Sequence, residues 1–267
     1  MARGIFVTGT DTGVGKTLIS CALIESLVDK GFKVVGMKPV ASGSEHLPEG
    51  LRNEDARALQ QVANVVTDYS LINPYCFAPA IAPHLAARQV GQSIDLARLL
   101  DAYGQLETLA DIVVVEGAGG WRVPSEPRGY LSDFPEALKL DVILVVGLRL
   151  GCLNHALLTA QAIQSGPCRL VGWVGNQLEP VFPEVDANVQ TLAQRLEVPC
   201  MGVVPYMENS RVETAAANVN APSIAGTWVI PLDAPSSKGE KAFRLIVQQQ
   251  GADVAASILR IDGDTGS

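Results

Sequence analysis

A glycine-rich loop with a lysine and a threonine lies almost at the start of the chain, in the stretch FVTGTDTGVGKT over residues 6–17. An apolar run precedes it and a helix-like stretch follows, a context in which backbone N–H groups at a helix N-terminus can surround phosphate oxygens. Gly13 and Gly15 let the backbone come close to a ligand. Lys16 would neutralise the β and γ phosphates, and the Thr17 hydroxyl would bind Mg²⁺. The first glycine of the usual pattern GxxxxGK[ST] is displaced by one position, but the context favours a phosphate-binding loop over a plain turn.

Four further polar residues are candidates for the same site. Lys38 follows an apolar run and could neutralise a reacting anion, although taken alone a solvated lysine at a strand end explains it better. Asp55 opens a helical pattern, where it is either a cap or an oxygen ligand of Mg²⁺. Glu116 ends an apolar run, and a carboxylate there is costly unless it is paired or metal-bound, so a functional role is favoured. Asn154 could simply cap the following helix, whose N-terminus would attract carboxylates.

These residues must be positioned by a layered α/β fold. Short apolar runs rich in Val and Ile, without polar alternation, are typical of strands that are buried on both faces. The runs are GIFVTG, KVVGMKPV, DIVVVEG, DVILVVG, LVGWVGN and CMGVVPY, and helix-like segments lie between them at 18–30, 54–63, 94–108, 154–165 and 186–196. The alternation predicts a mostly parallel central sheet with helices on both faces, a Rossmann-like architecture. With the phosphate-binding loop after its first strand, this architecture is expected to be of the P-loop NTPase type. Ligands of such sheets bind beyond the carboxyl ends of the strands, where the polar candidates stand.

Length, charge and cysteine content narrow the class of protein. The 267 residues suit one large domain over 1–209 with a C-terminal extension over 210–267, partly ordered or packed on the same domain. A net charge of -8 without clustered basic residues argues against nucleic-acid binding. Five scattered cysteines without a CxxC pair suit a reducing compartment, and no leader or long apolar run is present, so we expect a cytoplasmic protein without a membrane segment. In the extension, an ordinary packed element over 241–260 is favoured over an amphipathic membrane helix.

Taken together, the motifs resemble the dethiobiotin synthase family of the phosphate-loop NTPase superfamily. The resemblance covers roughly residues 4–209 and is carried by FVTGTDTGVGKT, KPVASGSEHLPEGLRNEDA, NPYCFAPAIAPH, VVVEGAGGW, VILVVGLRLGCLNHALLTAQAI, GWVGNQ and GVVPYM. Partitioning and division-site ATPases of the superfamily carry an extra lysine where this chain has Asp11. The absence of that lysine argues against a switch of this type. A partner-regulated ATPase switch is kept as the alternative, and an amidoligase ranks lower because the chain lacks room for a glutamine-hydrolysing domain.

The resemblance implies a ligase of biotin synthesis that uses ATP and Mg²⁺. Its substrates would be 7,8-diaminononanoate and CO₂ or bicarbonate, and its products dethiobiotin, ADP and phosphate. A substrate amine captures CO₂ as a carbamate, the carbamate attacks the γ-phosphate, and the second amine closes a cyclic urea on the mixed anhydride. Both nucleophiles belong to the substrate, so the protein has only to position the reactants and stabilise charge. The family also implies a homodimer with the substrate site at the subunit interface.

The same resemblance assigns roles to individual residues. Lys38 and Lys16 would be catalytic, and Thr17, Asp55 and Glu116 would hold Mg²⁺. The nucleotide would contact Gly13, Val14, Gly15, Lys16, Thr17, Leu18, Asp55, Glu116, Gly117, Ala118, Gly119, Asn176, Gln177, Pro205, Tyr206 and Met207. The substrate would contact Thr12, Ser42 and, from the neighbouring subunit, Gly151, Cys152, Leu153 and Asn154. Gly13 stands where members of the family often carry Glu, a change that leaves the backbone cradle usable.

Overall fold

A six-stranded sheet forms the centre of the molecule. The computed structural model describes residues 3–125, 128–206, 226–231, 242–250 and 253–261, the last three ranges by their backbone. All neighbouring strands of the central sheet run parallel, in the order β10-β9-β8-β1-β7-β2. The strands are β1 (Arg3–Gly9), β2 (Val34–Met37), β7 (Ile112–Glu116), β8 (Asp141–Leu148), β9 (Arg169–Gln177) and β10 (Cys200–Val204). Each arises from one of the six apolar runs, so the predicted parallel sheet is confirmed.

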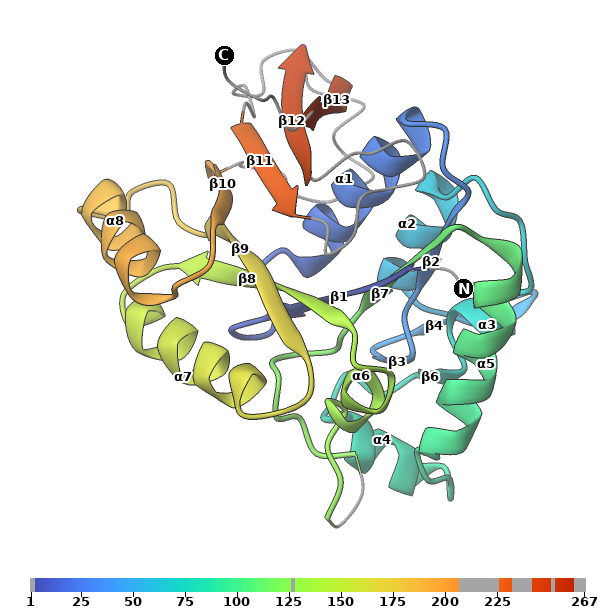
Figure 1. The fold of residues 1–267 in the computed structure, drawn as a ribbon. Helices are drawn as coiled ribbons and strands as arrows, with labels where there is room; N and C mark the ends of the chain where they lie inside the picture. Colours follow the sequence, from blue (N-terminus) through green and yellow to red (C-terminus); the bar gives the residue numbers. More distant parts are fainter. Residues whose placement is uncertain (1–2, 126–127, 207–225, 232–241, 251–252, 262–267) are drawn as a thin grey trace.

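Helices cover both faces of this sheet, as Figure 1 shows. On one face lie α1 (Lys16–Asp29) and α2 (Glu54–Val62). On the other lie α5 (Leu96–Leu109), α6 (Asp133–Leu138) and α7 (Cys152–Gln164), with α8 (Val185–Arg195) packed beside α7. The five predicted helices correspond to α1, α2, α5, α7 and α8. The α/β architecture with helices on both faces is therefore confirmed.

Successive residues of the strands serve two separate cores. Val7 and Val145 belong to the apolar cluster under α1 and α2, whereas Phe6 and Leu144 belong to the cluster under α5, α6 and α7. All four side chains are at most 4% exposed. Burying such a side chain contributes about 1.5–3 kcal/mol, which explains why the strands lack polar alternation.

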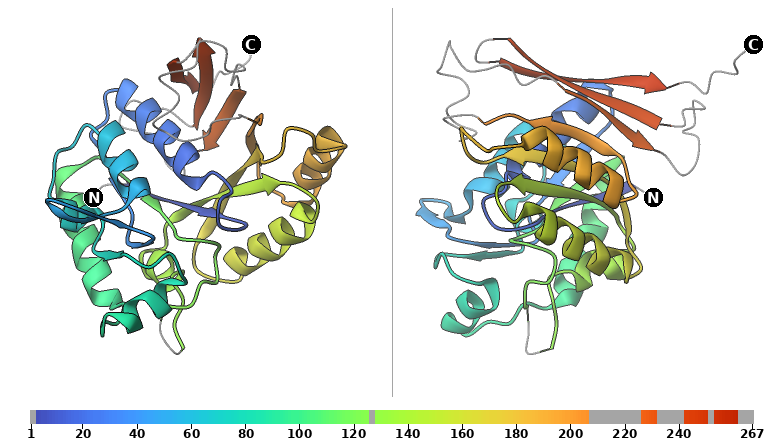
Figure 2. Two further views of the ribbon diagram at one scale, coloured as in Figure 1. Left: turned by 180° about the vertical axis from the view of Figure 1, so that it is seen from behind. Right: turned by 90° about the vertical axis from the view of Figure 1, so that its left-hand side faces the viewer.

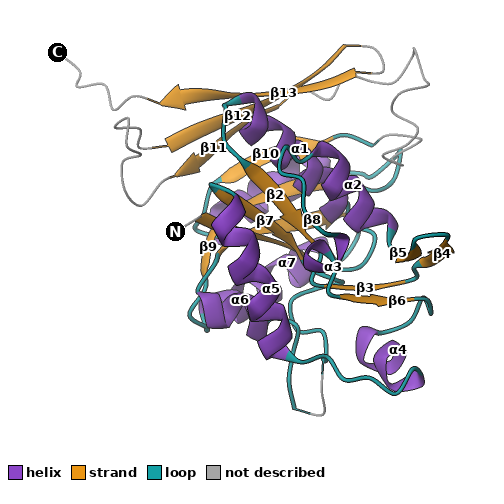
Figure 3. Ribbon diagram, turned by 90° about the vertical axis from the view of Figure 1, so that its right-hand side faces the viewer, coloured by secondary structure: helices purple, strands orange, loops and turns teal. Residues whose placement is uncertain are grey.

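Several short elements border the site and were not predicted. β3 (Val40–Ser42) pairs in parallel with β6 (Tyr75–Phe77), and β4 (Glu45–Leu47) forms a hairpin with β5 (Gly50–Arg52). The short helices α3 (Tyr69–Ile72) and α4 (Pro83–Gln89) lie nearby, as Figure 3 shows. Elements of three to seven residues are too short to carry a readable period. Their main effect is to bring Ser42 and the start of α4 to a large cavity at the edge of the central sheet.

The C-terminal residues add a second sheet. Its antiparallel strands are β11 (Gly226–Pro231), β12 (Ala242–Gln250) and β13 (Asp253–Ile261). The sheet lies along α1 and beside β10 (Figure 2). The segment 241–260 thus contains strands, and no described helix is long and apolar enough to cross a membrane. The predicted domain boundary at 209/210 falls outside the described residues and stays a prediction.

Candidate active site

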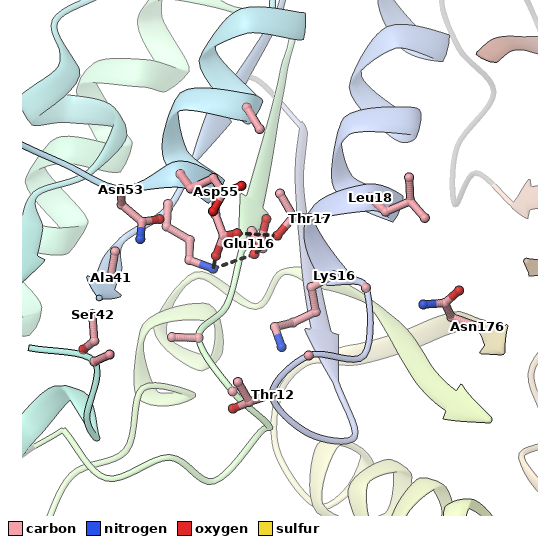
Figure 4. Close-up of a pocket in the computed structure, with 18 of the residues that line it drawn as sticks. Thr12, Lys16, Thr17, Leu18, Ala41, Ser42, Asn53, Asp55, Glu116 and Asn176 are labelled. Carbon is pink, nitrogen blue, oxygen red and sulfur yellow. Dashed lines mark hydrogen bonds and ion pairs between the residues drawn. The ribbon is translucent and has the colours of Figure 1, made fainter. Parts of the chain in front are cut away.

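A cavity of about 940 Å³ opens at the carboxyl ends of the central strands. It is bordered by the loop before α1, the ends of β7 and β9, and the starts of α2 and α4. The predicted site residues that line it are Thr12, Gly13, Gly15, Lys16, Thr17, Leu18, Lys38, Ser42, Asp55, Glu116, Ala118, Gly119, Asn176, Gln177, Pro205 and Tyr206. Residues from distant parts of the sequence therefore converge on one crevice, as Figure 4 shows for ten labelled side chains.

The loop before α1 is held in shape by a contact from β9. Gly15 caps α1 with φ +90°, in the left-handed region that favours glycine. A Cβ atom at this position would collide with Nδ2 of Asn176. That same nitrogen donates a hydrogen bond of 2.9 Å to the carbonyl oxygen of Val14. The Val14 side chain is buried in the core. Only the backbone of Val14 could therefore make the predicted contact with the nucleotide.

Lys16 points its ammonium group at the mouth of the loop. Its Nζ donates to the carbonyl oxygen of Asp11 at 2.9 Å. Burial lowers the pKa of Lys16 to about 8, and the nearby Lys38 ammonium contributes to this lowered pKa, against the opposing carboxylates. An anion bound in the loop would relieve both effects, because it would supply the negative charge that the ammonium lacks.

Lys38, Asp55, Glu116 and Thr17 form a tight polar cluster on the cavity floor. Nζ of Lys38 lies 2.5 Å from Oε1 of Glu116 and 2.8 Å from Oδ2 of Asp55. It also donates to the carbonyl oxygen of Gly117 at 3.2 Å. The Thr17 hydroxyl lies 2.8 Å from Oδ1 of Asp55 and 3.0 Å from Oε1 of Glu116. The cluster joins the ends of β2 and β7 to the starts of α1 and α2.

Charge and burial oppose each other in this cluster. Burial alone would lower the pKa of Lys38, but Glu116 and Asp55 outweigh it and raise the pKa, so the amine is protonated. Burial would likewise raise the pKa of Asp55, but Lys38 outweighs it and the carboxylate is ionised. For Glu116, burial and then the charge of Asp55 raise the pKa despite the opposing Lys38. One ammonium group is thus shared by two carboxylates, and a further cation would stabilise both.

The same cluster fits a magnesium ion. Oε2 of Glu116 has no hydrogen-bond partner among the described residues, although the side chain is only 1% exposed. A carboxylate oxygen left in this state is costly unless a ligand completes it. Thr17 and Asp55 supply further hard oxygen atoms, which Mg²⁺ prefers, together with phosphates and water. Within the described part of the chain, no group of three or more His, Cys, Asp or Glu side chains could hold a metal. The residues therefore fit an ion that a bound phosphate helps to hold.

The cavity also has an apolar part of its wall, which was not predicted from the sequence. It includes Ala41, Ala80, Ile81 and Val123. Ser42 lies beside it, and its buried hydroxyl finds no hydrogen-bond partner in the described ranges. These residues give no signal in the sequence because apolar residues in loops and in a three-residue strand follow no readable period. An apolar wall with one unpaired hydroxyl suits a ligand with an aliphatic chain and a polar end.

Other sequence predictions have different outcomes. Asn53, whose side chain accepts from the backbone of Ala56, caps α2, so the interpretation of Asp55 as the cap is wrong. Gly151, and not Asn154, caps α7. The segment Gly151–Asn154 does not line the cavity, and its predicted role on a neighbouring subunit stays a prediction. Met207 lies outside the described residues.

Comparison with known proteins identifies the family. Residues 3–214 match the family model of the AAA domain. The ATP-dependent dethiobiotin synthetase of Xanthomonas campestris pv. campestris is 46% identical over 217 residues, which cover 81% of this chain and 97% of that protein. The synthetase of Pseudomonas aeruginosa is 48% identical over 216 residues, which cover 80% of this chain and 95% of that protein. The chain belongs to the dethiobiotin synthetase family. It is therefore an enzyme, and the alternative of a partitioning-type switch is not favoured.

Solved structures agree with the dethiobiotin synthetase assignment at the level of the fold. A ParA family ATPase from Chlorobium tepidum superposes with a TM-score of 0.51 at 14% identity, covering 78% of this chain and 86% of that one. The MinC:MinD cell division protein complex of Aquifex aeolicus superposes with a TM-score of 0.50 at 17% identity. The match covers 79% of this chain and 84% of that one. At such identities the likeness shows a shared architecture alone. Strands β11, β12 and β13 lie beyond residue 214, where the match to the family model ends.

Proposed function

We propose that this member of the dethiobiotin synthetase family carboxylates 7,8-diaminononanoate with CO₂ and closes the product to dethiobiotin, with ATP and Mg²⁺. The observation that carries the proposal is the convergence of Lys16, Lys38 and the oxygen cluster of Glu116 on one cavity. The cavity also has an apolar wall for an aliphatic diamine. Such a site can hold a triphosphate and a small chain side by side.

ATP would lie with its phosphates in the loop before α1 and its base toward the ends of β9 and β10. The amide nitrogen of Asn176 is committed to the carbonyl oxygen of Val14, which leaves its Oδ1 as the acceptor. An acceptor at this position suits the exocyclic amino group of adenine. Gln177, Pro205 and Tyr206 line the same end of the cavity.

Thr17, Asp55 and Glu116 would hold Mg²⁺. When bound, the ion supplies positive charge that neutralises phosphate oxygens during transfer. The protein's part is to keep these three oxygen donors in place, and Lys38 does so by binding both carboxylates.

The chemistry then requires no nucleophile from the protein. One substrate amine bonds to the carbon of CO₂ and loses a proton, which gives a carbamate. A carbamate oxygen bonds to the γ-phosphorus as the bond to ADP breaks. The second amine bonds to the carbamate carbon, loses a proton and expels phosphate, which closes the cyclic urea. Lys38 and Lys16 would stabilise the carbamate and the transferring phosphoryl oxygens.

A homodimer completes the proposed site. The start of α7 at Gly151–Asn154 does not line the cavity of its own chain, which is consistent with a role toward a neighbouring subunit. A helix N-terminus without a side-chain cap attracts a carboxylate such as that of the substrate. Light scattering of the purified chain tests the dimer. A cytoplasmic location is supported by the five cysteines, all of which are free thiols.

The proposal is tested by measuring phosphate release and dethiobiotin formation with ATP, Mg²⁺ and diaminononanoate, with and without bicarbonate. Turnover should require both the diamine and bicarbonate. Lys38→Ala should lower kcat by about 10²- to 10³-fold, the usual effect of removing one electrostatic donor. Lys33→Ala, which removes an exposed lysine at the opposite end of β2, is the matched control. Equal ATP hydrolysis in the absence of the diamine would refute the proposal.

A further inference from the structure

Asp11 places a carboxylate at the entrance of the phosphate-binding loop. Its Oδ1 accepts from the backbone nitrogen of Thr12 at 2.7 Å, and its backbone carbonyl accepts from Nζ of Lys16. The side chain is 47% exposed, so it is not hidden from an incoming anion. A negative charge at this position opposes the binding of a triphosphate. Lys16 does not cancel that charge directly, because it binds the carbonyl oxygen and not the carboxylate.

Arg149, which directly follows β8, forms an ion pair with Asp11. Nη2 of Arg149 lies 2.5 Å from Oδ2 of Asp11. Two further contacts join the same strand to the loop: the backbone nitrogen of Thr10 donates to the carbonyl oxygen of Val145, and that of Gly147 donates to Oγ1 of Thr10. The end of β8 thus runs alongside the loop, and Arg149 is the third point of attachment.

A contribution to the stability of the fold does not explain this ion pair well. Its two side chains are 40% and 47% exposed, and pairs that exposed to water contribute little to folding. The position is more informative, because the pair stands at the opening of a site for a polyanion.

We infer that Arg149 is a positioning residue that neutralises Asp11 and thereby keeps the phosphate-binding loop receptive to the nucleotide. This rests on the proposed nucleotide site and adds a residue that the family resemblance did not assign. Removal of Arg149 leaves a bare carboxylate at the loop. Removal of the Asp11 charge as well should then restore binding.

The test is a double-mutant cycle on the affinity for MgATP, measured with the full chain by titration calorimetry at low salt. At an assumed separation of about 9 Å in water, a unit charge and the two net charges of MgATP interact strongly enough to change the affinity about fivefold. Arg149→Gln should raise Kd by about this factor, and Asp11→Asn in that background should return Kd to within about twofold of wild type. The matched control is Arg169→Gln, which removes one equally exposed arginine from an ion pair with Asp141 at the start of β8 and β9.

The melting temperature of Arg149→Gln should stay near that of wild type, and its binding defect should shrink as salt is raised. Arg149→Lys should bind nearly as well as wild type. An unchanged Kd in Arg149→Gln would overturn the inference, as would a double variant that binds as weakly as Arg149→Gln. Failure of the wild-type chain to bind MgATP would overturn the nucleotide site itself, and the inference with it.

Discussion

Replacement of Gly15 by alanine should disable the phosphate-binding loop without unfolding the protein. Two costs add at this position. The backbone sits at φ +90°, where a residue with a Cβ atom is strained by about 1–2 kcal/mol. The new Cβ would also collide with Nδ2 of Asn176, so the hydrogen bond to Val14 must break, at about 0.5–1.5 kcal/mol. The sum is about 1.5–3.5 kcal/mol, which sets the largest loss of affinity for MgATP at roughly 13- to 370-fold, reached where the free loop relaxes fully out of its binding conformation.

Gly13 provides the control for this prediction. Its φ of +74° is also in the left-handed region, but nothing described lies within 4 Å of a Cβ atom placed there. Gly13→Ala should therefore suffer the backbone strain alone and bind MgATP more tightly than Gly15→Ala. Calorimetric titration of both variants with MgATP, alongside thermal unfolding, gives the comparison.

A third variant separates strain from collision. In Gly15→Ala combined with Asn176→Ala the clashing amide is absent, so the thermal stability lost in Gly15→Ala should partly return. If Gly13→Ala and Gly15→Ala lost affinity equally, the contact between Gly15 and Asn176 would have no part in shaping the loop, and the reasoning from this collision would be refuted.

Three further changes probe other parts of the molecule. Asp55→Asn should raise the Mg²⁺ concentration for half-maximal activity by at least the roughly 10- to 100-fold that loss of an outer-shell partner costs, and an unchanged Mg²⁺ titration would exclude Asp55 as a ligand. Burial and then the charge of Asp29 raise the pKa of Glu25, so the ionised side chain destabilises the folded state above that pKa. Glu25→Gln should therefore stabilise the protein by about 0.2–0.5 kcal/mol at pH 7, a gain that denaturant unfolding should show to vanish as the pH falls toward the ordinary glutamate pKa of 4.5. Burial raises the pKa of Cys168 to about 11 and raises that of Cys21 further, so mass spectrometry should find neither alkylated by iodoacetamide in the native protein at pH 8, and rapid labelling of either would contradict their burial.

The central sheet could be predicted because its strands are buried on two faces. Val7 and Phe6 face different cores, as do Val145 and Leu144, and this makes each run continuously apolar and easy to recognise. The pairs β3–β6 and β4–β5 escaped prediction for the opposite reason. Their three residues each are too few for a period, and their positions follow from tertiary contacts, such as the amide of Asn73 binding the carbonyl oxygen of Lys38.

The charged part of the site could be predicted because topology brings strand ends together. Lys38 and Glu116 end neighbouring parallel strands, so their approach follows once the strand order is known. The ion pair of Arg149 with Asp11 could not be predicted in this way. In the sequence each residue, taken alone, is explained equally well as a charged side chain that is exposed to solvent. The same holds for Ile81 and Val123, which reach the cavity from loops.

Helix α1 connects the added sheet to the site. Its sequence KTLISCALIESLVD has no continuous polar face, and even Ser20 and Ser26 are fully buried. A helix of this kind must be covered on more than one side. The central sheet and α2 cover one side, and the backbones of β12 and β13 run along another. Because the phosphate-binding loop leads directly into α1, whatever fixes this helix also fixes Lys16 and Thr17. Strands β12 and β13 therefore belong to the framework of the site, although neither lines the cavity.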